Sequence, residues 1–367
     1  MEGGAVHLVA MPAAGAARLH AVDGALAPPP PPLLLPEAGF CDPGIAAMHR
    51  DSGGSVGALG CWMLPQGTVG GRFLLGHGGR SVVAPDIAPA YVRAALEADT
   101  LPDAAHRGGV ALRRVKGRVA AIGSLGYETF GHWLLDILPR FWVLRRTLGS
   151  AADRLRFAVP DDMPGFGHRL LAAMGVGPDR LVAYARGSEA LQADTLVVPS
   201  MMHEDYRFHP EARGFYESVV DSMPRPRGLP ERLLISRQGW QGGPVQAARL
   251  LVNGPELAAA LAPLGFVTIR PETLPWPEQV ALFAGARVVV GEHGSAMKNL
   301  VFAGAGTAVV NMHFLNQTQS LIAALRGHRM MYLDAEIVGT SPDGVLSYRI
   351  DPGKLLACAQ AAIKAAA

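Results

Sequence analysis

Short apolar runs alternate with segments of helical character along the chain, most regularly from residue 155 onward. Apolar runs at 155–160, 181–184 and 196–199 have the length of buried strands, and 167–174 has helical spacing. Strands that alternate with helices predict a parallel sheet of the α/β class.

A second series follows residues 223–230, a stretch with three prolines that we interpret as a linker. Asn253 is a suitable N-cap residue and Pro255 suits a first helical turn, so a helix should begin there. The expected strands are 233–236, 266–269, 287–291, 307–312 and 330–333, and the expected helices are 253–264, 277–285, 296–303 and 352–367.

The pattern in the first 150 residues is less regular. Residues 55–90 are rich in glycine between short apolar runs, which predicts short strands and turns. Residues 109–123 predict a hairpin that leads into a buried strand, and 129–148 predict a helix bent at Pro139. Five consecutive prolines, 28–32, predict a stiff spacer.

A chain of 367 residues exceeds one ordinary core, so we expect two domains. Its hydrophobic fraction of 49% and charged fraction of 17% supply cores for both and exclude wholesale disorder. We assign 1–40 to an N-terminal extension with the proline run, 41–222 to an N-terminal α/β domain, 228–345 to a C-terminal Rossmann-like domain and 350–367 to a terminal helix.

Charge and cysteine content limit the classes of partner and site that the chain can have. It has 33 basic and 31 acidic residues, a net charge of +2. This balance predicts no binding to nucleic acid but leaves room for a local basic site. Cys41, Cys61 and Cys358 are far apart and form no C-x-x-C pair, so neither a zinc site nor a disulfide framework is indicated. A reducing cytoplasm is the simplest location.

The mean hydropathy of +0.20 raises the question of a membrane segment. Every apolar run is interrupted by Gly, Pro or a charge before it reaches about 18 residues, the length that a spanning helix needs. The N-terminus has no basic leader. We therefore expect neither a transmembrane segment nor a signal peptide.

The densest candidate chemistry lies at 288–300, where a buried strand is followed by a polar turn and a helix. Ligands of open α/β sheets bind beyond the carboxyl ends of strands, where free amides and the helix dipole favour an anion. Gly294 lets the backbone approach a phosphate, while His293 and Lys298 add hydrogen bonds or charge. The alternative is an ordinary strand–helix turn with a solvated histidine.

Two neighbouring segments bear on this turn. Arg237 follows the strand 233–236, so it should lie along the same sheet edge, where its guanidinium suits a phosphate. A surface ion pair is the alternative for Arg237. Glu278 and Gln279 lie in the helix before the strand, and we interpret them as structural anchors of the turn.

The first half carries a second candidate site. His132, Asp136 and Arg140 follow at intervals of four residues and share one helix face. A histidine in contact with a carboxylate can act as a general base with an orienting partner. The spacing alone favours the alternative, an intrahelical pair that contributes about 0.2–0.5 kcal/mol to helix stability.

Taken together, these motifs resemble glycosyltransferase family 61, with order and spacing that agree over residues 110–315. The segment 130–140 is similar to the family's H-W-L-x-D-x-L-P-R element. Ser236-Arg237 with Arg249 and Asn253 resembles its S-R…R-x-x-x-N element, and Glu278-Gln279 with 291–302 resembles its E-Q…G-x-H-G-A-x-x-x-N-x-x-F signature.

The resemblance implies a GT-B fold, in which two Rossmann-like domains face an interdomain cleft. It implies inverting transfer of a hexosyl or pentosyl group from a nucleotide sugar, usually a UDP-sugar, with no metal and no other cofactor. The chain accordingly has no D-x-D triplet. The donor would be bound by Arg237, His293, Gly294, Ser295, Lys298, Asn299 and Asn311.

The acceptor implied by the resemblance is a glycan or a lipid-linked glycan, held against the N-terminal domain. Asp136 or His132 would be the catalytic base, and Arg140, Glu278 and Gln279 would be acceptor-side or structural residues. Relatives that build bacterial surface polysaccharides, such as capsules, imply a cytoplasmic enzyme with room for peripheral contact at the inner face of the membrane. A homo-oligomer is compatible with the sequence.

Four positions depart from the family pattern. Thr129 stands where an Asn is usual, and Asn311 stands where an acidic residue would hold the nucleotide ribose, which leaves the nucleotide open. Glu292 and Lys298 replace small or apolar residues. Two other functions stay open: a sugar-nucleotide 2-epimerase-like isomerase, and a non-catalytic nucleotide-sugar-binding component of a polysaccharide assembly complex, which the changes at 129 and 311 favour.

Overall fold

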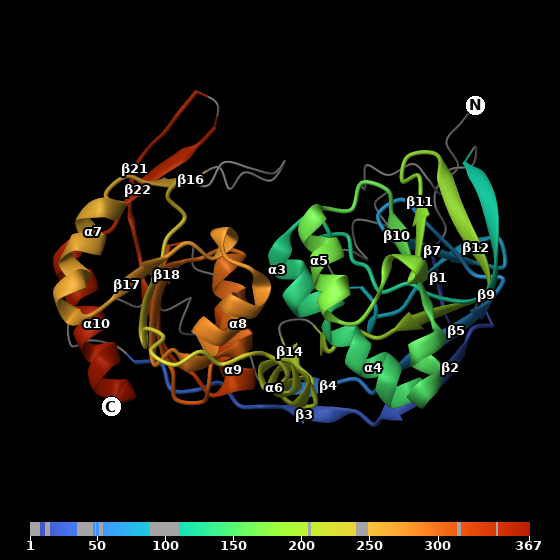
Figure 1. Ribbon diagram of the computed structural model, residues 1–367, viewed down its shortest axis with the longest axis horizontal. Coiled ribbons are helices and arrows are strands. Elements are labelled where there is room, and N and C mark those ends of the chain that lie inside the picture. Colours follow the sequence, from blue (N-terminus) through green and yellow to red (C-terminus); the bar gives the residue numbers. More distant parts are fainter. Residues whose placement is uncertain are drawn as a thin grey trace. The chain divides into compact units, whose positions relative to one another are not determined.

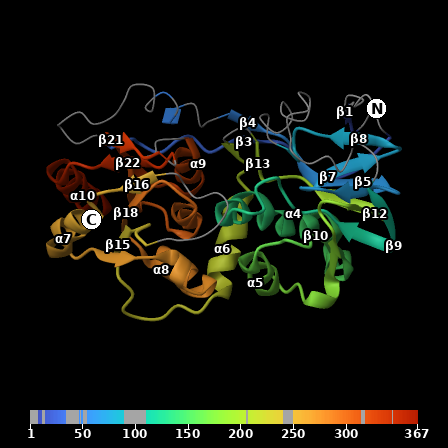
Figure 2. The same ribbon diagram turned by 90° about the horizontal axis from the view of Figure 1, so that it is seen from above.

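The computed structural model falls into two compact units (Figures 1 and 2). The first comprises Met1–Ala25 and Ser55–Asp205, and the second comprises Leu26–Gly54 and Tyr206–Ala367. The residues that the structure describes are 8–11, 15–34, 47, 49–50, 54–88, 110–204, 207–239, 249–313, 317–342 and 344–367. Cys41 and much of the expected extension 1–40 lie outside them.

The division falls at 205, whereas the expected N-terminal domain ended at 222. Residues 206–222 lie in the second unit because helix α6 (Ala212–Ser222) packs against α8 (Trp276–Gly285), η7 (Ala296–Phe302) and α9 (Gln317–Arg326). Two short two-stranded sheets, β3 (Ala25–Ala27) with β4 (Gly54–Val56) and β13 (His203–Glu204) with β14 (Arg207–Phe208), lie at the unit boundaries.

The first unit is built on a ten-stranded mixed sheet. Its strands are β1 (Leu8–Ala10), β2 (Ala17–Val22), β5 (Leu59–Pro65), β6 (Thr68–Gly70), β7 (Leu74–His77), β8 (Arg80–Val83), β9 (Ala111–Ala120), β10 (Arg156–Pro160), β11 (Leu181–Tyr184) and β12 (Glu189–Pro199). The run β12-β9-β10-β11 is parallel, as the pattern after residue 155 predicts. Strands β5 and β6 each pair antiparallel with β12, and β6 pairs antiparallel with β7 because the turn between β6 and β7 is too short for a parallel crossover.

The hairpin expected at 109–123 is wrong: β9 is one strand of ten residues. Gly117, inside the segment expected to be a hairpin, lies at a φ of +83°. It forms a bulge where the register against β12 shifts between Ala193 and Thr195. The Gly117 amide donates to the Asp194 carboxylate at 2.7 Å. Pairing with β12 along its whole length therefore keeps the strand continuous.

The helix expected at 129–148 is present in three parts. It consists of α3 (Phe130–His132), the π-helix η2 (Trp133–Ile137) and α4 (Pro139–Leu148). The Leu138 amide donates to the Trp133 carbonyl, five residues back, at 2.9 Å. Pro139 lies in the first turn of α4, where its missing N–H costs little, so the irregularity expected at the proline is the preceding π turn.

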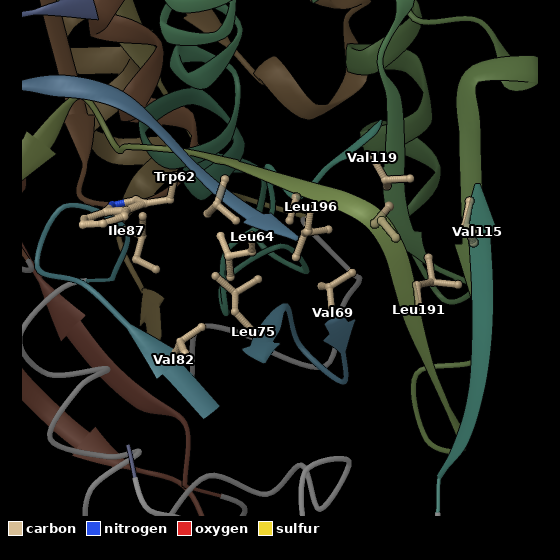
Figure 3. Close-up of a cluster of buried hydrophobic side chains, with 14 of the residues drawn as sticks. Trp62, Leu64, Val69, Leu75, Val82, Ile87, Val115, Val119, Leu191 and Leu196 are labelled. Carbon is tan, nitrogen blue, oxygen red and sulfur yellow. The ribbon is translucent and has the colours of Figure 1, made fainter. Parts of the chain in front are cut away.

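Apolar side chains from many strands form the core of the first unit (Figure 3). Leu64 of β5 and Leu191 and Leu196 of β12 are fully buried there. Helix α4 packs against β2 and β5. Further helices in the described part of this unit are η3 (Gly149–Arg154), α5 (Gly165–Ala173) and η4 (Pro178–Arg180).

The second unit contains a wholly parallel five-stranded sheet. Its spatial order is β17 (Val267–Ile269), β15 (Arg232–Ile235), β18 (Val288–Glu292), β19 (Ala308–Met312) and β20 (Arg329–Leu333). In chain order this is 2-1-3-4-5, a doubly wound topology whose order reverses between β15 and β18. Ligands of such sheets bind beyond the carboxyl ends of the strands at this switch point.

Helices cover both faces of this sheet. On one face, α7 (Gly254–Leu261) and α10 (Pro352–Ala366) bury apolar residues against β18 to β20, while α8, η7 and α9 lie on the other (Figure 1). The short helices η5 (Ala262–Leu264) and η6 (Pro271–Thr273) complete the connections. A small sheet of β16 (Arg249–Leu251), β22 (Leu346–Arg349) and β21 (Glu336–Thr340) adjoins them.

The helix expected after β18 is present as the 3₁₀-helix η7, whereas two other local expectations for this unit are corrected. Asn253 occupies the N-cap position of α7, but its side chain bridges to the Ile350 backbone at 2.8 and 3.2 Å instead of capping. Helix α9 was not expected: its residues from Gln319 to Arg326 are all buried, so it lacks the alternation of polar and apolar positions that marks a surface helix.

The proline run 28–32 has no regular secondary structure, as expected for a spacer. It leads to Leu33, which bridges to Met330 of β20 in the parallel sense. His49, from the same stretch of the chain, contacts the Ser320 hydroxyl of α9 at 2.9 Å. The segment is thus attached to the second unit by specific contacts.

A buried histidine makes the stability of the second unit sensitive to acid. Burial lowers the pKa of His328 to about 3, although its contact with the Ala303 carbonyl opposes this. Below pH 6.5 the unfolded chain binds a proton that the folded chain does not, so stability should fall by about 1.4 kcal/mol per pH unit for this group. Denaturant unfolding of the wild type and His328→Gln between pH 7 and 4.5 measures this, with a shallower slope expected for the variant. Parallel slopes would contradict it.

Candidate functional site

The His132 helix places a buried carboxylate between two imidazoles. Asp136 lies within the π turn and is 5% exposed. His132 Nδ1 lies 2.7 Å from its Oδ2, and His203 Nε2 lies 2.9 Å from its Oδ1. The Ser124 hydroxyl donates to Oδ2 at 3.2 Å. Both carboxylate oxygens are therefore engaged.

The two imidazoles decide the ionisation of this carboxylate. Burial alone would raise the pKa of Asp136, but the charges and hydrogen bonds of His132 and His203 outweigh it and hold the pKa well below its ordinary value. Asp136 is therefore ionised at neutral pH and accepts a proton poorly. A carboxylate in this state orients an imidazole through its Nδ1–H and leaves Nε2 as the basic atom.

The His132 ring is the accessible member of the group. Its side chain is 30% exposed, against 7% for Asp136 and 12% for His203. Gly126 packs against the ring: an added Cβ would lie 2.8 Å from His132 Nδ1 and closer still to two ring carbons. The absence of a side chain at 126 therefore sets the position of the imidazole.

Arg140 follows on the same helix but is buried, at 2% exposure. It donates to the Asp136 carbonyl at 3.0 Å and to the Ile87 carbonyl at 3.1 Å, which holds the π turn against the loop after β8. With Ser124, Asp136 and Arg72 it also lines a cavity of about 60 Å³, large enough for a few water molecules. Of the roles considered for Arg140, these contacts favour the structural one.

In the second unit, cationic side chains gather at the switch point between β15 and β18. Arg237, two residues beyond β15, donates to the His293 carbonyl at 3.3 Å. Arg249, the first residue of β16, donates to the same carbonyl. An added Cβ at Gly294 would lie 3.5 Å from one guanidinium and 3.6 Å from the other, so both flank the turn.

These cations act on His293. Burial, together with the charges of Arg249, Lys298 and Arg237, lowers its pKa to about 3. The imidazole is therefore neutral at physiological pH, and the positive charge of the cluster resides on the two arginines and the lysine. Three cations around a glycine-bearing turn at a sheet switch point form a site suited to an anion.

The turn itself presents backbone amides. The Met297 amide donates to the Gly294 carbonyl at 3.2 Å and the Lys298 amide to the Ser295 carbonyl at 3.1 Å. Gly294 and Ser295 thus precede the hydrogen-bonded part of η7. Amides at such a position are the ones that point away from a helix.

Two of the predicted site residues anchor this turn from beneath. Asn299 is fully buried and donates to Gln279 Oε1 at 3.0 Å and to the Ala296 carbonyl at 3.1 Å. Gln279 in turn donates to the Leu274 carbonyl at 3.0 Å. These contacts tie η7 to α8, whereas Glu278 points to an exposed surface of α8.

Asn311, expected at the donor ribose, is fully buried on β19. Among the residues that the structure describes, neither its Oδ1 nor its Nδ2 has a hydrogen-bond partner. With no exposed surface, the side chain does not reach a ligand in this conformation. His313, the residue after β19, lies nearer the sheet edge, and its ring packs on Tyr348 with centroids 4.7 Å apart.

Sequence reasoning missed three participants. His203 lies 67 residues beyond Asp136, and no local pattern connects them. Arg249 was noted as part of a motif, but its convergence with Arg237 requires the sheet topology. Glu292, a departure from the family pattern, is buried and accepts a hydrogen bond from the Tyr348 hydroxyl.

Two further observations concern the described residues alone. They contain no group of three or more His, Cys, Asp or Glu side chains arranged to hold a metal ion. No helix among them has the length and apolar character needed to traverse a bilayer.

A comparison with models of protein families identifies the family of this chain. The family model described as Glycosyltransferase 61 matches residues 130–310, a range that begins at α3 and ends within β19. It contains His132, Asp136, Arg237 and the turn at 293–295, and it ends one residue before Asn311. A search of curated proteins found no match.

The cation cluster yields a direct prediction. Arg249→Ala should weaken binding of inorganic pyrophosphate roughly 10- to 100-fold, because one charge-assisted contact is lost. Isothermal titration calorimetry measures it, with Arg270→Ala as the control for lost charge, since Arg270 is paired with Glu272 at 3.1 Å. Equal affinities for the wild type and Arg249→Ala would remove this arginine from the anion site.

Proposed function

The chain belongs to glycosyltransferase family 61 and is a glycosyltransferase; from this premise we propose that it moves a sugar from a nucleotide-sugar donor to a hydroxyl of a glycan acceptor. In this proposal the transfer inverts the anomeric configuration and needs no metal. The donor is a UDP-sugar that binds the second unit, and the acceptor binds the first.

The observation that carries the proposal is the Asp136 carboxylate between His132 and His203. His132 is the base: its Nε2 takes the proton of the acceptor hydroxyl while its Nδ1–H remains bonded to Asp136 at 2.7 Å. The low pKa of Asp136 supports this choice between the two candidate bases. His203 holds the second carboxylate oxygen and so fixes the orientation of the pair.

The bond changes follow from this assignment. The acceptor oxygen, as it loses its proton to His132, attacks the anomeric carbon from the face opposite the diphosphate. A new C–O bond forms, the bond from the anomeric carbon to the phosphate oxygen breaks, and its electrons remain on the leaving diphosphate. Inversion is the outcome of this single displacement.

Charge on the leaving diphosphate is met by Arg237, Arg249 and Lys298 together with the amides at Gly294 and Ser295. Their convergence around the His293 carbonyl supports this assignment. Three fixed cations can provide the stabilisation that a metal ion provides in other transferases, because electrostatic groups aimed at developing charge lower the barrier directly.

The biological setting is also a proposal. Resemblance to relatives that build bacterial surface polysaccharides supports a glycan or lipid-linked glycan acceptor and a role in capsule-type synthesis at the cytoplasmic face of the membrane. Either a hexosyl or a pentosyl group fits this role.

Substitution of Asp136 tests the base assignment. Asp136→Asn should lower kcat by about 10²–10⁴-fold, because an amide cannot accept both imidazole N–H groups and the His132 tautomer changes. Affinity for UDP, measured by calorimetry, should stay near the wild-type value. A variant with full turnover would discard the assignment.

A separate assay distinguishes the proposed transferase from the isomerase alternative. Wild-type enzyme is incubated with a UDP-sugar in the absence of any acceptor, and the nucleotide sugar is analysed by NMR. A transferase leaves the sugar configuration unchanged, whereas an accumulating 2-epimer would replace the proposed function. Absence of nucleotide binding altogether would favour a non-catalytic component.

Gly126 offers a second test that leaves every titrating group in place. Gly126→Ala should lower kcat about 10-fold or more, since the methyl group displaces the His132 ring from Asp136 and a general base acts only within hydrogen-bond reach. Gly187→Ala is the control, because an added Cβ there meets no atom within 4 Å. Equal turnover by both variants would show that the ring position does not matter.

A further inference from the structure

Alternate residues of β9 form an exposed row on the first unit. Leu112, Arg114, Lys116 and Arg118 are all exposed, and Leu112 has 51% of its surface accessible. Val115 and Val119, at odd positions of the strand, are buried in the core (Figure 3). Successive residues of a strand face opposite sides, so Leu112, Arg114 and Lys116 share the outer side, and the exposed Arg118 follows them beyond the Gly117 bulge.

This part of β9 is also an edge of the sheet. Strand β12 pairs with β9 along its length, but β10 pairs only with Val119 and Ala120. Among the strands that the structure describes, residues 111–118 therefore have one neighbour.

The three cations of the row have no ion-pair partner among the residues that the structure describes. Arg113, on the other face of the strand, differs: its Nε lies 2.5 Å from the Glu189 carboxylate. The acid nearest the row in the strand register is Asp194, whose Oδ2 accepts the Gly117 amide. Arg156 of β10 donates to the Lys116 carbonyl and adds a fourth cation.

The row follows the strand across the bulge at Gly117. Alternate residues of a strand are about 6.8 Å apart, so the charges from Arg114 to Arg118 extend over roughly 13 Å. The exposed Leu112 continues the same line. Cations next to an exposed apolar side chain are the combination that suits the interface of an anionic bilayer, where the charges meet phosphates and the apolar group enters the headgroup boundary.

We propose that the outer face of β9 binds the surface of a bilayer that contains anionic phospholipids. Leu112 favours a bilayer over a soluble polyanion, because a polyanion in water gains nothing from an exposed leucine. The row is also separate from the proposed base. Ser124, which contacts Asp136, lies six residues beyond Arg118, the last cation of the row, or about 20 Å along an extended chain.

Charged side chains on an edge strand have a second possible use, since they keep the edge from pairing with another chain. That use requires no lipid binding and gains nothing from Leu112. The two explanations therefore differ in what removal of the charges does to vesicle binding.

The experiment is cosedimentation of the full chain with sucrose-loaded vesicles of phosphatidylcholine alone or with 30% phosphatidylserine (about one charge in three lipids, enough to attract basic segments). The wild type should bind only the anionic vesicles, and less in high salt. The variant R114Q/K116Q/R118Q should bind about 100-fold more weakly, from a contribution of about fivefold per cation. Leu112→Ser should weaken binding several-fold at every salt concentration.

The matched control is R225Q/R270Q/R349Q, which removes the same charge from three exposed arginines of the second unit that are paired with Asp221, Glu272 and Glu256. It should bind as the wild type does. Thermal unfolding and UDP affinity of all variants check that they are folded.

Three results would overturn the proposal. The wild type could fail to bind anionic vesicles, the β9 variant could bind as well as the control variant, or a soluble polyanion such as heparin could bind the row while vesicles do not. Loss of turnover in Asp136→Asn without loss of vesicle binding is expected, because the row and the base are independent.

Discussion

The ionised carboxylate of Asp136, buried between two imidazoles, is the constraint on which the chemistry of the first unit depends. Removing a charge from water is costly, and the hydrogen bonds of His132, His203 and Ser124 compensate for it here. The bonds to the two imidazoles in turn fix both rings. The more accessible His132 imidazole gains a defined direction because the buried carboxylate is held in place behind it.

The second unit carries a cationic cluster that is suited to a negatively charged group. Its strand order reverses between β15 and β18, the point at which sheets of this topology bind ligands. Arg237 and Arg249 converge there on one carbonyl, that of His293. A backbone acceptor shared by two guanidiniums keeps these like charges close together.

The parallel sheet of the second unit was predictable because its strands are short apolar runs between helices with clear ends. The mixed sheet of the first unit was not, since glycine-rich stretches such as 55–90 specify turns but not pairing partners. Among site residues, His132, Asp136 and Arg237 stand in local motifs. His203 stands in no local motif, and Arg249 stands in one that does not show its role, because both roles depend on contacts between segments far apart in sequence. Asn311 occupies a motif position, yet burial removes it from the surface.

The π turn at Trp133–Ile137 has a geometric consequence for the helix that contains it. The π turn contains one residue more than an α-helical turn. This extra residue rotates the preceding residues by about 100° about the helix axis relative to α4. The face of α4 that packs against the strands and the face that carries His132 therefore point in different directions along one continuous helix. Deletion of one residue from the π turn would bring the two faces into line without unwinding the helix.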